Sequence, residues 1–122
     1  MVNSIIILCE DSPFGKNSVV ETIRMATGIL AIGDIDDCKV VFMKDSIYFL
    51  SKNLNPDALK VDHFTNIMRL IELSDLEIYV HDKALEDAGM VVSDLMPGDN
   101  IKVVNIEKIS ELIAEANMSF KY

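Results

Sequence analysis

Four short, almost unbroken apolar runs constrain the fold of this chain more than any other feature of its sequence. The first, at residues 4–9, reads SIIILC and is followed by two acidic residues; the others lie at residues 39–43, 76–80 and 101–104. Continuous runs of this length that are rich in β-branched residues are typical of strands buried on both faces, as the strands of parallel sheets are. We therefore expect residues 5–8 to form a central strand of a parallel sheet.

Helical patterns separate these runs. Apolar residues recur at helical spacing between residues 19 and 31, and further helices are expected at residues 46–51, after Asp62, at residues 81–88 and after Asn105, a favourable capping residue. Residues 118–122 alternate and predict an additional edge strand. Strands that alternate with helices are typical of βαβ units, so we predict a mainly parallel sheet of four to five strands, covered by helices on both faces. The length of 122 residues predicts one domain over residues 1–122.

The composition excludes several classes of function. The formal net charge is −9, with 20 acidic against 11 basic residues, and such a field repels a nucleic-acid backbone. There is no apolar run of membrane-spanning length and no signal peptide, and two cysteines do not make a disulfide framework; we expect a cytoplasmic protein. The two histidines, His63 and His81, lack cysteines at ligand spacing, so we predict no metal and no cofactor.

Half of the residues are hydrophobic, and the mean hydropathy is +0.26. Apolar surface that a small chain cannot bury within itself usually lies in contacts between subunits. We therefore expect an oligomer.

Two nucleotide- and phosphate-related motifs are matched only in part. Residues 15–17 read GKN, but a phosphate-binding loop would require serine or threonine at Asn17 and glycine at Glu10. A phosphoacceptor receiver domain would place its acceptor aspartate after the third strand, whereas Asp45 follows the second. Neither function is favoured.

Three segments carry recognisable motifs in a fixed order and spacing, namely Ser12-Pro13-Phe14-Gly15, residues 42–50 around Asp45, and His81 with Gly89. Together they resemble the DsrE/DsrF-like family of sulfur-relay proteins (TusC/TusD-type). After its first strand that family has a serine-proline-aromatic-glycine loop, matched here by Ser12-Pro13-Phe14-Gly15. A second strand ends in a motif around an aspartate, matched by residues 42–50 with Asp45. A third strand leads into a cysteine followed eight residues later by glycine, and here the pair is His81 and Gly89.

The resemblance implies a three-layer α/β/α fold. It also implies assembly, either as a homo-oligomer (a trimer or hexamer) or as a hetero-oligomer with related subunits, and a sulfur-carrier protein as a possible partner. Carriers in the family hold a persulfide on the cysteine whose position is His81 here, and imidazole cannot hold a sulfane sulfur. The resemblance therefore implies an oligomeric subunit of intracellular sulfur relay or sulfur oxidation that lacks the carrier cysteine and is not a stand-alone enzyme. The alternative is a non-catalytic small-ligand or regulatory binding module on the same fold.

Ligands bind beyond the carboxyl ends of the strands in open α/β sheets. This rule predicts a cleft formed by the loop Ser12-Pro13-Phe14-Gly15, Asp45 and His81. Cys9 ends the first strand, and if the first and third strands are neighbours, a charged His81 would favour its reactive thiolate. In the other interpretation Cys9 is a small hydrophobic residue at the end of a buried strand. Cys38 begins a strand and is expected at the opposite end of the sheet.

Overall fold

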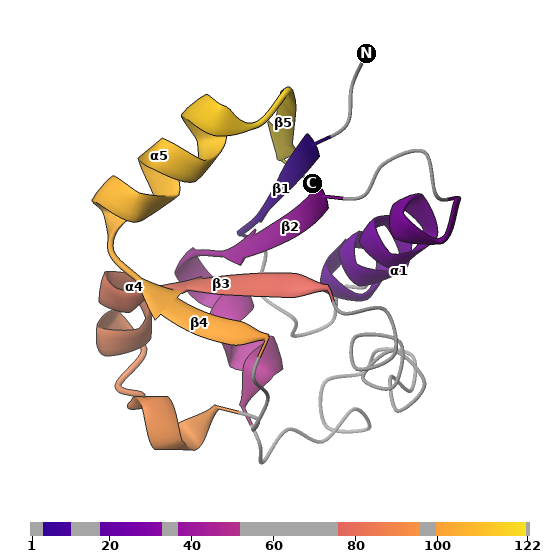
Figure 1. Ribbon diagram of the computed structural model, residues 1–122. Coiled ribbons are helices and arrows are strands. Elements are labelled where there is room, and N and C mark those ends of the chain that lie inside the picture. The colour runs from indigo at the N-terminus through magenta and orange to yellow at the C-terminus, as the bar shows by residue number, and fades with distance from the viewer. Residues whose placement is uncertain (1–3, 11–17, 33–36, 52–75, 96–99, 122) are drawn as a thin grey trace.

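Five parallel strands form the central layer of the protein in a computed structural model that describes residues 4–10, 18–32, 37–51, 76–95 and 100–121 (Figure 1). The strands lie in the order β4-β3-β2-β1-β5, and every neighbouring pair is parallel. Their bounds are β1 (Ser4–Cys9), β2 (Asp37–Phe42), β3 (Glu77–His81), β4 (Ile101–Val104) and β5 (Met118–Lys121). The predicted parallel sheet is confirmed, and β1 is an inner strand because it pairs with both β2 and β5.

Helices cover both faces of the sheet, which gives the three layers. On one face lie α1 (Ser18–Ile32), the 3-10 helix η1 (Lys44–Leu50) and α4 (Asp82–Asp87), which contribute to a single apolar core with the sheet. On the other face α5 (Ile106–Glu115) packs through Ile109 and Leu112. Figure 1 shows α1 and α5 on opposite sides of the strands. A short 3-10 helix, η2 (Val92–Asp94), follows α4.

Side chains of β1 alternate between these two cores. Ile5, Ile7 and Cys9 pack on the α1 side, whereas Ile6 packs on the α5 side with the half-buried Leu8. Burying an isoleucine or leucine side chain contributes roughly 1.5–3 kcal/mol. A strand with apolar neighbours on both faces therefore requires a continuous apolar run, which is the pattern that the sequence shows.

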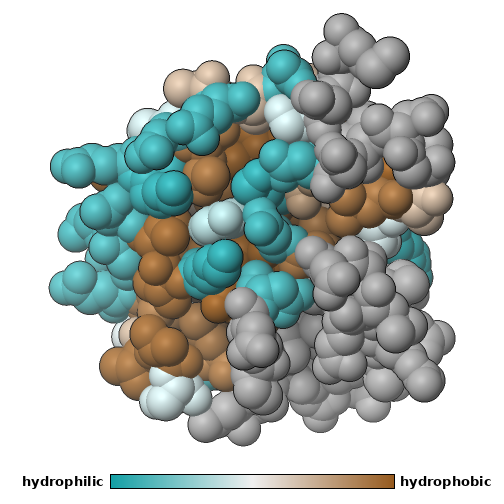
Figure 2. Space-filling view, viewed as in Figure 1, coloured by the Kyte–Doolittle hydropathy of each residue, from teal (hydrophilic) through white to brown (hydrophobic). Residues whose placement is uncertain are grey.

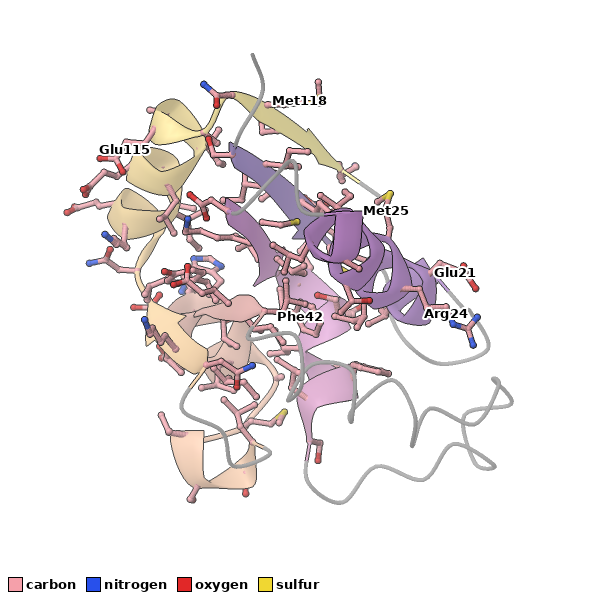
Figure 3. The ribbon with its side chains drawn as sticks, turned by 45° about the vertical axis from the view of Figure 1, so that its right-hand side comes forward. Glu21, Arg24, Met25, Phe42, Glu115 and Met118 are labelled. Carbon is pink, nitrogen blue, oxygen red and sulfur yellow. The ribbon has the colours of Figure 1, made fainter. Side chains whose placement is uncertain are left out.

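The α1-side core is the larger of the two. Phe42, at the end of β2, is fully buried there, and its ring lies 6.3 Å from that of Phe49 of η1 (Figure 3). On the solvent side of α1, Arg24 and Glu21 form an ion pair at 2.9 Å. The carboxyl end of β2 is thus fixed between the sheet and η1.

Two predicted helix ends are confirmed, the start of α5 and the end of α4, whereas the short helix expected at residues 46–51 is the 3-10 helix Lys44–Leu50. The side chain of Asn105 accepts a hydrogen bond from the backbone N–H of Lys108 and caps α5. Gly89 has a φ of 73° just after α4, a conformation that glycine adopts without steric cost. The helix expected after Asp62 lies outside the described residues. Within the described ranges, none of the helices has the length and apolar character needed to cross a membrane.

Candidate functional site

The carboxyl ends of β2 and β3 open into a cleft of about 480 Å³. One wall comes from the end of β2 and η1, and the other from the end of β3 and α4. The structure brings Asp45 and His81 together in this lining, as the rule for parallel sheets predicts. The lining residues are Met43, Lys44, Asp45, Tyr48, His81, Lys83, Ala84, Asp87 and Ala88.

The wall formed by η1 is attached to the end of β1. The backbone carbonyl of Cys9 accepts a 2.9 Å hydrogen bond from the N–H of Met43. The Ser46 hydroxyl lies 2.7 Å from that same carbonyl and 2.7 Å from the carbonyl of Met43, and its side chain is fully buried. Ser46 therefore provides the polar contact that lets the chain turn from β2 into η1 beneath the cleft.

Lys44 begins η1 in a left-handed conformation, with a φ of 53°. This conformation disfavours residues that have a Cβ, by roughly 1 kcal/mol or more. The Lys44 Nζ lies 3.1 Å from Oε2 of Glu10, the residue that follows β1, and Nζ of Lys121 lies 3.6 Å from the same oxygen. One carboxylate thus connects the carboxyl ends of β1, β2 and β5 beside the cleft.

His81 stands at the end of β3 and in the N-cap position of α4. Its side chain makes no capping hydrogen bond and is 17% exposed, and its Nε2 lies 3.9 Å from Oδ1 of Asp82. Lys83 and Asp87, one turn apart on α4, lie 4.0 Å from each other at their charged ends. The cleft therefore presents hydrogen-bonding groups and charged groups of both signs together with the apolar side chains of Met43, Ala84 and Ala88. It can accept a polar small molecule or a segment of another protein.

Cys9 does not reach this cleft. An approach of Cys9 to His81 was conditional on β1 and β3 being neighbours, and this condition is not met, because β2 lies between them. The other interpretation, a small hydrophobic residue at the end of a buried strand, agrees with the burial of Cys9. Cys9 pairs in register with Phe42, and its side chain is fully buried in the α1-side core. His81 is therefore not a neighbour that favours a thiolate at Cys9.

Cys38 lies at the other end of the sheet, as the sequence predicts. It sits near the start of β2, opposite Ile5 of β1, and is buried. Burial, and then the negative charge of Asp37, raises the pKa of the Cys38 thiol to about 11, so the thiol is protonated near neutral pH. Since the chain has two cysteines, both of its thiols are buried.

Some of the predicted site falls outside the described residues, namely the loop Ser12-Pro13-Phe14-Gly15. Sequence reasoning missed Tyr48, Lys83 and Asp87, although Lys83 and Asp87 are four residues apart on the helix that follows His81, a spacing that places both on one face. Among the described residues, histidine, cysteine and acidic side chains do not form a group of three that could hold a metal ion.

Comparisons with known proteins agree on one family. The model of the DsrE/DsrF-like family matches residues 3–121. A protein named "Protein TusC homolog" from Pasteurella multocida (strain Pm70) is 29% identical over 84 residues, which are 68% of this chain and 71% of that protein.

Two solved structures share the fold. The crystal structure of the ychN protein from E. coli matches 98% of this chain and 99% of its own, with a TM-score of 0.81 and 12% identity. The protein of unknown function MTH1491 from Methanobacterium thermoautotrophicum matches 100% of both chains, with a TM-score of 0.67 and 13% identity. These likenesses confirm the α/β fold.

Proposed function

The chain belongs to the DsrE/DsrF-like family, and on this basis we propose that it is a sulfur-relay subunit that holds no sulfur itself and acts in complex with a related, cysteine-bearing subunit. The name of its Pasteurella relative, a TusC homolog, supports a place in such a relay. The observation that carries the proposal is the burial of both thiols, Cys9 and Cys38.

A sulfur carrier needs a thiolate that its donor and acceptor can both reach. In each transfer the acceptor thiolate attacks the outer sulfur of a persulfide, the S–S bond breaks, and the donor leaves as a thiolate, so no external oxidant is required. Neither Cys9 nor Cys38 can take part in such a step without opening of the core around it. The position that is open to the cleft holds His81, which has no sulfur chemistry.

The work of this subunit would then be to bind and orient the carrier. The carboxyl-end cleft offers a surface with Lys44, Asp45 and Lys83 that matches a polar segment of a partner. The same cleft favours a second candidate function, a small-ligand binding module, because its volume of about 480 Å³ falls in the range of small-molecule sites.

A variant without thiols separates a carrier from a non-carrying subunit. The chain and its double variant Cys9→Ala, Cys38→Ala are each combined with a cysteine-bearing DsrE/DsrF-like subunit of the same organism, and transfer of labelled sulfur from that subunit to an acceptor thiol is measured. The proposal expects the two chains to support transfer equally, within about twofold. A loss of tenfold or more, in a variant whose circular dichroism shows a native fold, would mean that the chain carries sulfur. If neither chain binds the carrier or changes transfer, the ligand-binding function is favoured.

A further inference from the structure

Two adjacent valines are the most exposed large hydrophobic residues that the described part of the chain contains. Val91 is 60% and Val92 is 63% exposed, at the point where the chain leaves α4 and enters η2. Figure 2 shows hydrophobic surface gathered at the lower left, where η2 lies in Figure 1. Exposed apolar pairs are common on mobile tails, but this one is held in place.

Backbone hydrogen bonds fix the conformation that presents the valines. The N–H of Met90 donates to the carbonyl of Leu85 at 3.1 Å, which folds the chain back onto α4. The N–H of Val91 donates to the Asp94 carboxylate at 2.9 Å, while the N–H of Asp94 donates to the carbonyl of Val91 at 2.9 Å. Leu95 then enters the core and bridges to Ser51. A preorganised apolar surface loses little freedom when a partner covers it.

The charges around the valines indicate what kind of partner fits. Residues 82–94 contain four acidic side chains, Asp82, Glu86, Asp87 and Asp94, against the single lysine Lys83, which leaves an excess of three negative charges. A second copy of the chain that docked through the same surface would bring the same negative charge against it, and like charges brought together at an interface disfavour association. A partner with apolar side chains surrounded by basic ones is complementary.

The valines also adjoin the cleft. Ala84, Asp87 and Ala88 of α4 line the cleft, and three residues after Ala88 the chain reaches Val91. A partner seated on the valines therefore lies next to the end of the helix that lines the cleft.

From these observations we propose that the α4–η2 surface, defined as Glu86, Asp87, Val91, Val92 and Asp94, is where the cysteine-bearing related subunit docks, through an apolar patch with a basic rim. This inference rests on the proposed function and deepens it by assigning the contact surface and its chemistry.

Matched substitutions test the surface. The dissociation constant of the complex between this chain and a cysteine-bearing DsrE/DsrF-like subunit of the same organism is measured by titration calorimetry. Val92→Ser, and more strongly Val91→Ser with Val92→Ser, should weaken binding, by at least tenfold for the pair. Glu86→Lys should weaken it several-fold and reduce its dependence on salt. The control is Met118→Ser on β5, at the opposite edge of the sheet, where Met118 is 46% exposed (Figure 3); it should change the constant by less than twofold.

Three results would overturn the inference. Unchanged binding in the valine variants would show that the carrier docks elsewhere, and the proposed function would survive. Self-association of the chain that the valine variants abolish, measured by light scattering, would assign the surface to a second copy. Absence of any complex with the carrier would refute both the surface and the proposed function.

Discussion

The ends of β1 and β3 lie on either side of β2, yet their last residues have opposite surroundings. Cys9 ends β1 with its side chain in the α1-side core, beneath η1. His81 ends β3 with its side chain in the lining of the cleft. Both residues stand at carboxyl ends of parallel strands, where function is expected, but only one of these ends is open.

The difference comes from the register of the strands and from the path of the chain after β2. Cys9 aligns through Phe42 with Val80, which is buried in the same core, and His81 lies one residue farther along its strand. The chain leaves β2 at Met43 and turns at once into η1, whose Ser46 is hydrogen-bonded to the carbonyl of Cys9. This turn covers the end of β1 and leaves the end of β3 to form a wall of the cleft. A strand end is therefore a site only if no adjacent element packs over it.

The largest expected effect comes from removing the ring that packs beside Cys9. Phe42→Ala deletes a fully buried side chain between the sheet and η1, and such substitutions cost about 3–5 kcal/mol. Urea denaturation should show that the free energy of unfolding falls by this amount. The thiol of Cys9 should also become reactive to alkylation. The comparison variant Met118→Ala should lose less than about 0.5 kcal/mol. A loss below about 1 kcal/mol for Phe42→Ala would show that this core does not protect Cys9.

The buried thiol at the other end of the sheet predicts a dependence of stability on pH. The pKa of Cys38 is about 11 in the folded chain against an ordinary value of 9.0, so the unfolded chain releases this proton first as the pH rises. The buried, protonated thiol of Cys38 therefore adds about 2–3 kcal/mol to the free energy of unfolding. This contribution is fully present below pH 9 and is lost between about pH 9 and 11. Cys38→Ala should remove this part of the pH dependence in parallel denaturation series. Identical pH profiles for the two proteins would contradict the assignment.

A smaller effect is expected at the turn that covers β1. Ser46→Ala removes the hydroxyl from the carbonyl of Cys9, which keeps its bond from Met43. The free energy of unfolding should fall by about 1 kcal/mol, the usual contribution of one hydrogen bond. Alkylation of Cys9, followed by mass spectrometry, should accelerate while that of Cys38 stays unchanged. Equal acceleration at both thiols would mean global rather than local opening.

The smallest effect is expected at Lys44. Lys44→Gly relieves the left-handed conformation at a φ of 53°, but it adds freedom to the unfolded chain and removes the exposed pair with Glu10. These contributions nearly cancel, so the free energy of unfolding, measured by chemical denaturation, should change by less than about 1 kcal/mol. A loss above about 2 kcal/mol would show that the pair with Glu10 holds the carboxyl ends of the strands together.

Sequence reasoning predicted the elements well because apolar periodicity depends on local burial. The runs that became β1 and β4, and the cap at Asn105, carry their own local signals. The same reasoning placed Asp45 and His81 at one end of the sheet, because parallel strands align their carboxyl ends.

The order of the strands was not predictable in this way. Nothing local in residues 4–9 or 77–81 indicates that β2 separates them, so the sequence left the pairing of Cys9 with His81 conditional on the strand order. The role of Ser46 was not predictable either, since its buried hydroxyl bonds to the end of a strand that is distant in the sequence. Sequence periodicity does not indicate which elements far apart in the chain contact one another.

The most direct test of the account is whether the native chain accepts a sulfane sulfur. The wild-type chain and His81→Cys are incubated with a low-molecular-weight persulfide donor, and intact mass is recorded before and after reduction. We expect no reducible sulfur adduct on the wild type, because Cys9 and Cys38 are buried, and one adduct on His81→Cys, whose thiol lies in the cleft. A sulfur atom bound to Cys9 of the native wild-type chain would contradict the account.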